Sequence, residues 1–373
     1  MKHNFIYIFF TLLILGSCSR KKDKFLNKKF HSTTTKYNYL FNGNNLLIQG
    51  IDQANSDLIE NFWELIPIEK FDLKKINEKE KEQSIFTDAE EKATLAIQKH
   101  SMSIMGEERN PIMDEAYLLL GKSRYYDGRY IPSLEAFNYI LYKYPKSELI
   151  NEVKIWKEKI NIKLNQNDFA ESNLRDLLEQ NNLSDLDKYN IYSILAQAAI
   201  NMQQFDNAIS YLKKSLEFGF RPEKIYRNKF LLSQLYERKE IKDTAFTEYS
   251  EIIDFNRKIP REFYIQSFLK KSNVTDSLSL SVSELSDLLK DFENSKFLDV
   301  INFQLAKLYL NEYKLKEQKE FELKSIGFFN KSLEQNSSDN YLVSRNYLNL
   351  AEINFNNKNY FEAGLYYDST LTK

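Results

Sequence analysis

Large, small and helix-breaking residues recur at fixed spacings between Asp114 and Pro145. Apolar side chains three or four residues apart predict two helices, with a break at Gly128. One small residue stands in each helix, at Gly121 and Ser133, where it allows two antiparallel helices to approach closely. Pro145 lacks a backbone donor and ends the second helix. We expect the seam between the helices to be filled by three side chains: Tyr117, Leu120 and Phe137.

With Tyr117 numbered as position 4 of a 34-residue unit, Gly121 falls at position 8 and Tyr130 at position 17. This order of residues resembles the tetratricopeptide repeat (TPR), a helix–turn–helix unit. One unit cannot bury its own apolar face, so neighbouring units are required. The resemblance implies an all-α fold: a right-handed superhelical TPR solenoid in which the first helix of each pair, helix A, lines the concave side.

Later stretches of the chain fit the same numbering. Small residues stand at position 8 of four further units: Ala196, Ser233, Ala306 and Ala351. A degenerate unit places four residues at positions 4, 8, 17 and 20: Trp156, Ile160, Phe169 and Ser172. The helix pair Phe263–Lys271 and Val282–Leu289 has no small residues, and an insertion around Asn311–Lys319 delays the helix Phe321–Leu333. We therefore expect an array of unequal repeats.

Composition agrees with a repeat array. The chain of 373 residues contains only 9 Gly and 6 Pro, too few for the turns of a sandwich, barrel or doubly wound sheet. A solenoid can grow beyond the size of a single core. The formal net charge of −1 lacks the basic excess that nucleic-acid binding requires. The sequence therefore favours a protein partner and gives no sign of a nucleic acid.

The N-terminus has the pattern of a secretion signal. An apolar stretch, Phe5–Leu15, is too short to span a bilayer and fits the core of a signal peptide. The following Leu15-Gly16-Ser17-Cys18 resembles the bacterial lipoprotein signal-peptidase box, which implies a signal peptide over residues 1–17 and lipidation, including palmitate, of Cys18. This is the only cysteine, so disulfides are excluded. Because Ser19 is not Asp, we expect an outer-membrane anchor facing the periplasm.

Four domains are expected. Residues 1–17 are the signal peptide, residues 18–36 a basic tether and polar linker, and residues 37–110 an N-terminal helical segment with a first helix near Tyr37–Gln49. A helix from about Thr87 to Met105 ends that segment as helix B of an incomplete repeat. Residues 111–373 are the TPR solenoid. We expect it to be truncated at its C-terminal end, because Leu365 and Leu371 would otherwise lie on an uncovered apolar flank.

Four longer sequence segments, which follow the lipoprotein box in this order, resemble one family. They are FHSTTTKYNYLFNGN, NFWELIPIE, AIQKHSMSIMGEERNPIMDEAY and LLLGKSRYYDGRYIPSLEAFNYILYKYP, and they cover Cys18 to about Pro145. The family is the TPR lipoprotein of type IX secretion and gliding motility, the PorW/SprE type. The resemblance implies a scaffold that couples the periplasmic ring and motor complex to the outer-membrane translocon.

Residues suited to chemistry are few. His31 lies in the expected linker and His100 on a helix face, without carboxylates at a metal-binding spacing. Glu107 and Glu108 precede a turn, where a solvated or capping role is expected. Phosphate-binding loops and nucleophile motifs are absent from the sequence. We therefore expect no enzyme, no cofactor, no metal and no small-molecule substrate.

The expected binding surface is the concave face, read at positions 2, 5, 9, 12 and 13 of helix A. Candidate partner-binding residues are, in three units, Lys122, Tyr125 and Tyr126, then Gln197 and Asn201, then Gln234 and Arg238. Their polar, amide-rich character suits a folded or extended protein partner.

Two other classes of lipoprotein carry similar repeats. A glycan-capturing TPR lipoprotein needs long loops rich in Gly, Asp and Trp, and the chain has only 2 Trp. A TPR lipoprotein of outer-membrane barrel assembly would have a similar array. Only the four N-terminal sequence segments distinguish the secretion scaffold from this class.

Overall fold

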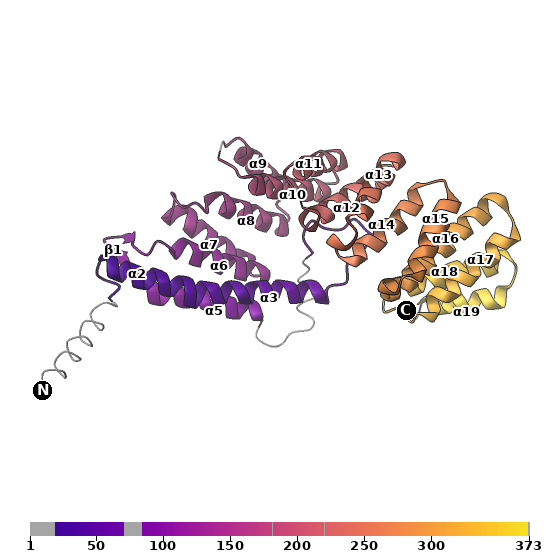
Figure 1. Ribbon diagram of the computed structural model, residues 1–373, viewed down its shortest axis with the longest axis horizontal. Coiled ribbons are helices and arrows are strands. Elements are labelled where there is room, and N and C mark those ends of the chain that lie inside the picture. Colours follow the sequence, from indigo (N-terminus) through magenta and orange to yellow (C-terminus); the bar gives the residue numbers. More distant parts are fainter. Residues whose placement is uncertain (1–18, 71–83, 181, 220, 372–373) are drawn as a thin grey trace, which may run out of the picture. The chain divides into compact units, whose positions relative to one another are not determined.

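The computed structural model describes residues 19–70, 84–180, 182–219 and 221–371. The expected signal peptide and Cys18 lie outside the described residues. The chain forms two compact units, unit 1 over Met1–Gly219 and unit 2 over Phe220–Lys373 (Figure 1). Both units are almost entirely helical, as the sequence predicts.

Unit 1 begins with a continuous helical run: α2 (Phe25–Thr34), the π-helical turn η1 (Thr35–Leu40) and α3 (Phe41–Asp57). The expected linker over residues 18–36 is therefore wrong from Phe25 onward. Leu40, Leu47 and Ala54, each seven residues from the next, are buried in one apolar cluster with α5 (Ile85–His100). A buried stripe of this spacing stabilises a helix through packing, which local polarity does not reveal.

The helix α5 begins at Ser84, whose hydroxyl accepts a hydrogen bond from the backbone N–H of Phe86. It ends at His100, five residues earlier than predicted, because the chain turns into a short hairpin of β1 (Ser103–Ile104) and β2 (Glu107–Glu108). The carboxylate of Glu108 accepts hydrogen bonds from the backbone N–H groups of Met102 and Asn110. Glu108 therefore ties the two ends of the hairpin together and caps no helix, whereas Glu107 is exposed, as one of the two expected roles requires.

The first strong repeat has the predicted seam. Helices α6 (Met113–Tyr126) and α7 (Tyr130–Lys143) cross at Gly121 and Ser133, and the Ser133 hydroxyl donates to the Gly121 carbonyl at 2.6 Å. A Cβ at Gly121 would lie 2.4 Å from Cε1 of Phe137. Since carbon atoms pack at about 3.5–4.0 Å, only glycine fits at this crossing.

Unit 1 continues with two more pairs: α8 (Ile150–Lys163) with α9 (Asn167–Leu178), and α10 (Asp185–Asn201) with α11 (Phe205–Phe218). Unit 2 contains α12 (Pro222–Arg238), α13 (Lys242–Phe255), α14 (Arg261–Val274), α15 (Leu278–Lys290), α16 (Leu298–Lys316), α17 (Lys319–Glu334), α18 (Asn340–Asn356) and α19 (Tyr360–Leu371), with the short turns η2 (Asn256–Lys258) and η3 (Phe292–Phe297).

The same turn joins helix A to helix B in five of these pairs. One residue with positive φ stands two positions before helix B: Gly128, Asn165, Gln203, Glu240 and Lys358. In each case its N–H bonds to the carbonyl three residues back, and the next N–H bonds to the carbonyl five residues back. This is the Schellman motif, in which glycine is usual. Four of the five positions lack glycine, so a sequence search for Gly cannot find them.

These turns correct the register of the degenerate repeat. Asn165 takes the place of Gly128, so helix B starts at Asn167, two residues before Phe169. Phe169 is accordingly 58% exposed and Ser172 is exposed, while Ala170 is fully buried at the crossing. The residue that corresponds to Gly121 is Glu158. A charged residue at the small-residue position concealed the true register.

The insertion in unit 2 lengthens a helix pair. Ser325 donates to the carbonyl of Ala306 at 2.9 Å, as Ser133 does to Gly121, but the two residues are 19 apart in sequence instead of 12. The extra residues extend α16 at its end and α17 at its start. The crossing is thus preserved, and the predicted late helix is confirmed.

The closing pair of α18 and α19 buries Leu350, Ala351 and Ala363. Beyond this seam, Leu365 is 54% exposed and Leu371 is 86% exposed. Both lie on the apolar flank that the sequence indicates. That further repeats follow stays a prediction.

Candidate protein-binding face

Helices A of unit 1 present a row of polar and aromatic side chains, which we call the A face: Lys122, Tyr125, Tyr126, Lys159 and Gln197. Lys122 is half-buried and pairs with Glu152, with 2.6 Å between Nζ and Oε1. Tyr125 is fully buried and Tyr126 nearly so. The prediction that these two tyrosines line an open surface is therefore wrong.

The tyrosines are covered by the chain's own segment Leu65–Lys70, which has no regular secondary structure. The hydroxyl of Tyr125 donates to Oε2 of Glu69 at 2.8 Å, and that of Tyr126 donates to Oε1 at 3.0 Å. The Nζ of Lys159 lies 3.5 Å from the same Oε1. One carboxylate thus connects α6 to α8.

Electrostatics at Glu69 favour the ionised carboxylate. Burial alone raises the pKa of Glu69, but the charges of Lys159 and Lys163 and the two phenol donors outweigh burial, so that its pKa is lowered. Burial, followed by the charge of Glu69, raises the pKa of Tyr125 and Tyr126 well above the ordinary value. The phenols therefore remain donors to an anion.

The segment continues to the third helix A. The backbone N–H of Ile68 donates to Oε1 of Gln197 on α10 at 2.8 Å. Gln197 in turn donates to Oδ1 of Asn201 at 2.9 Å, and Asn201 donates to Asn167 at 2.9 Å. Two predicted residues, Gln197 and Asn201, therefore belong to one amide network, and Gln197 holds the backbone of the segment.

Sequence reasoning missed Lys159. In the corrected register Lys159 stands at position 9, the place of Lys122 and Gln197 in the adjacent repeats. Its ammonium lies 4.4 Å from the ring centroid of Trp156, and the Trp156 ring meets that of Tyr125 edge-on at 5.2 Å. The turn at Asn165–Gln166 is the signal that could have located it.

In unit 2 the two predicted residues differ in accessibility. Gln234 is buried, so its predicted place on an open surface is wrong, whereas Arg238 is exposed. Between them, Glu237 accepts a hydrogen bond from the hydroxyl of Tyr249 at 2.8 Å. The side chain at position 9 here belongs to the packing of the repeat.

Two histidines that are 69 residues apart in the sequence are in contact. Nδ1 of His31 on α2 lies 2.9 Å from Nδ1 of His100 on α5, and both side chains are buried. Burial first, and then the charges of His31, Arg20 and Lys99, lower the pKa of His100 to about 4. Within the described ranges no group of three His, Cys, Asp or Glu residues could hold a metal ion.

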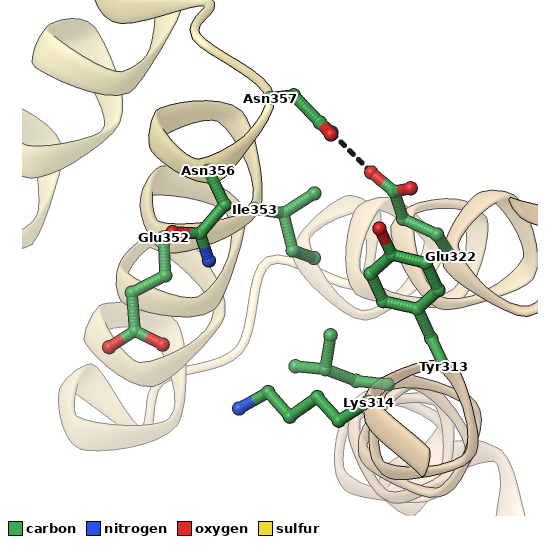
Figure 2. A pocket seen from close by; sticks show the side chains of 8 residues that line it. Tyr313, Lys314, Glu322, Glu352, Ile353, Asn356 and Asn357 are labelled. Carbon is green, nitrogen blue, oxygen red and sulfur yellow. Dashed lines mark hydrogen bonds between the residues drawn. The ribbon is translucent and has the colours of Figure 1, made fainter. Parts of the chain in front are cut away.

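A small hollow of about 60 Å³ lies in unit 2 between the lengthened ends of α16 and α17 and the end of α18 (Figure 2). Its polar centre is the buried Glu322, which Asn357 contacts through a hydrogen bond and Lys319 through an ion pair of 2.5 Å. Ligand pockets are typically roughly 300–1,000 Å³. The hollow is therefore small beside a typical ligand pocket.

In the described part of the chain, no helix is long and apolar enough to cross a membrane. No protein-family model and no curated protein matches the sequence.

Solved structures of similar fold include the C-terminal part of a TPR repeat-containing protein from Cytophaga hutchinsonii, with 14% identity and a TM-score of 0.49 over 69% of this chain and 93% of that chain. Another is a tetratricopeptide repeat protein from Parabacteroides merdae, with 15% identity and a TM-score of 0.40 over 69% and 90%. A third is a thermophilic TPR protein from Thermus thermophilus, with 18% identity and a TM-score of 0.31 over 62% and 96%.

Likeness at this level carries no argument, and the class follows from the helix pairs themselves. Small residues at positions 8 and 20, the repeated Schellman turns and the stacked helix A–helix B pairs define an all-α protein of the tetratricopeptide-repeat type.

Proposed function

We propose that this protein is an outer-membrane lipoprotein, anchored through Cys18 and facing the periplasm, that acts as a protein–protein interaction scaffold. The observation that carries the scaffold role is the A face, which holds an irregular stretch of chain through a carboxylate and a backbone N–H. Solenoid repeats present extended surfaces for binding, and hydrogen bonds to the backbone combined with side-chain sites are a general way to hold an extended chain.

The finer proposal is that the scaffold serves type IX protein secretion and gliding motility, and couples the periplasmic ring and motor complex to the outer-membrane translocon. Its support is the resemblance to the PorW/SprE type of the four N-terminal sequence segments that follow the lipoprotein box. A lipid anchor fits this role because a multiply acylated cysteine holds a periplasmic domain at the membrane surface.

Affinity capture of the tagged full chain from detergent-solubilised envelopes, followed by mass spectrometry, tests this proposal. We expect enrichment of ring and translocon components over a control bait that carries residues 1–24 fused to an unrelated soluble domain. Enrichment of barrel-assembly proteins, or of an outer-membrane sugar transporter, would instead identify one of the two alternative lipoprotein classes.

A further inference from the structure

The segment on the A face is an irregular stretch of chain that buries apolar side chains of its own, among them Ile66. With their partly buried members included, two apolar clusters of unit 1 extend from Tyr39 to Leu164 and from Ile155 to Tyr211. Among the described residues, neither cluster includes any part of Leu58–Lys70. The segment therefore meets the repeats through contacts of its own, among them those of Glu69 and of the Ile68 backbone.

The contacts are those of a receptor for a carboxylate beside apolar residues. Glu69 is met by two phenol donors and two lysines, from α6 and α8. Three residues before it, Ile66 is 1% exposed, and between them Pro67 forces the preceding residue toward an extended backbone. The bound sequence is thus a branched apolar residue, a proline, a second apolar residue and an acid.

We propose that the A face of unit 1 is a binding site for an extended segment of a partner protein that places a Glu or Asp beside branched apolar residues, and that Leu65–Lys70 occupies this site in cis. The inference rests on the proposed scaffold function and names the chemistry of its ligand. Charge complementarity selects the partner, because Lys159 and Lys163 repel a basic segment and attract an acidic one.

Occupancy in cis sets a threshold for the partner. A tethered ligand acts at an effective concentration on the order of millimolar. A partner segment must therefore bind more tightly than the chain's own segment, or be presented in several copies, before it displaces Leu65–Lys70. The scaffold accordingly binds its partner only where the partner is concentrated.

The test uses the full chain and a fluorescein-labelled peptide of residues Asn61–Lys70, titrated by fluorescence anisotropy. The double variant Ile66→Asp with Glu69→Lys releases the segment, because it buries one charge and places a cation against Lys159. We expect saturable binding of the peptide to this variant and no saturation with the wild-type chain at the same concentrations. A peptide in which Glu69 is replaced by Lys should bind about tenfold more weakly or worse.

Two further substitutions in the released variant identify the site. Lys159→Ala should weaken peptide binding about tenfold, because Lys159 contacts Glu69. Lys154→Ala, on the same helix but hydrogen-bonded to Gln180, should leave it unchanged. Should the double variant lose helicity by circular dichroism, the same titration is performed on Glu69→Gln alone, which weakens the cis contact without adding charge.

A folded, released chain that fails to bind the peptide overturns the proposal, and so does equal weakening by Lys159→Ala and Lys154→Ala. A wild-type dimer in light scattering that the peptide dissociates also overturns it, because the ligand is then a second copy of the chain. The titration needs no secretion component. Its failure is therefore distinct from a failure of the envelope capture, which would leave the peptide site standing without the proposed pathway.

Discussion

Replacement of Gly121 by alanine tests the crossing of α6 and α7. The added Cβ would lie 2.4, 2.7 and 2.8 Å from three ring carbons of Phe137. Normal contact at about 3.5 Å or more requires the ring to move by about 1 Å. Phe137 is fully buried and stacks on Trp156, with 6.2 Å between ring centroids, so it cannot move alone.

The expected magnitude follows from two opposed contributions. Overpacking of a filled core costs about 1–3 kcal/mol, whereas alanine is favoured over glycine inside a helix by about 1 kcal/mol. Because an approach of 2.4 Å is a severe overlap, the upper part of the first range applies, and we expect Gly121→Ala to lower the free energy of unfolding of unit 1 by about 1–2 kcal/mol. Gly121→Leu should cost more.

Urea unfolding followed by tryptophan fluorescence measures this, because both tryptophans, Trp63 and Trp156, lie in unit 1. Gly327→Ala in α17 is the matched control. A Cβ there meets no atom within 4 Å, so the same substitution should stabilise unit 2 by up to about 1 kcal/mol in far-UV circular dichroism. An unchanged or raised urea midpoint for Gly121→Ala would refute the crossing described here.

Three other predictions concern the anchor, the histidine pair and a turn. Cys18→Ala should abolish labelling by palmitate analogues and fractionation with outer membranes; a variant that retains both would contradict lipidation. As pH falls from about 7 toward 4, His100 becomes protonated in the unfolded chain near its ordinary pKa of 6.5, whereas in the folded chain it stays neutral until pH about 4. Unit 1 should therefore lose up to about 3 kcal/mol of stability over this range. His100→Gln should reduce this pH dependence in fluorescence-monitored unfolding. Glu240→Gly at a left-handed φ of 59° should raise the stability of unit 2 by about 0.5–1 kcal/mol, whereas Lys239→Gly, at φ −87°, should lower it; equal effects of the two substitutions would argue against the turn geometry.

The seam of each well-formed repeat could be predicted from the sequence, because packing two helices closely demands particular residue sizes. Gly121, Ser133 and Phe137 satisfy that demand visibly. The degenerate repeat does not, since its crossing holds Glu158. Burial raises the pKa of this carboxyl, and its oxygens accept hydrogen bonds from the side-chain amides of Asn161 at 2.7 Å and Asn173 at 3.1 Å. A crossing held by hydrogen bonds needs no small residue, so the sequence there lacks the alternation of small and large side chains that reveals the other crossings.

The bound segment could not be predicted for a different reason. Periodicity locates side chains around one helix axis but not which distant segment covers them. Glu69 lies 56 residues from Tyr125 and 90 from Lys159, and Ile68 lies 129 from Gln197. The sequence segment NFWELIPIE contributed to the family resemblance, yet nothing in it indicates which helices it contacts. The buried contact between His31 and His100 was missed for the same reason.

The lengthened pair α16–α17 gives the array a landmark. Repeats that share one shape offer a partner several equivalent places to bind, each displaced from the next by one unit. A lengthened hairpin with a small hollow at Glu322 differs from the other helix pairs in length as well as in sequence. A partner that contacts this extension has no second equivalent place to bind in unit 2.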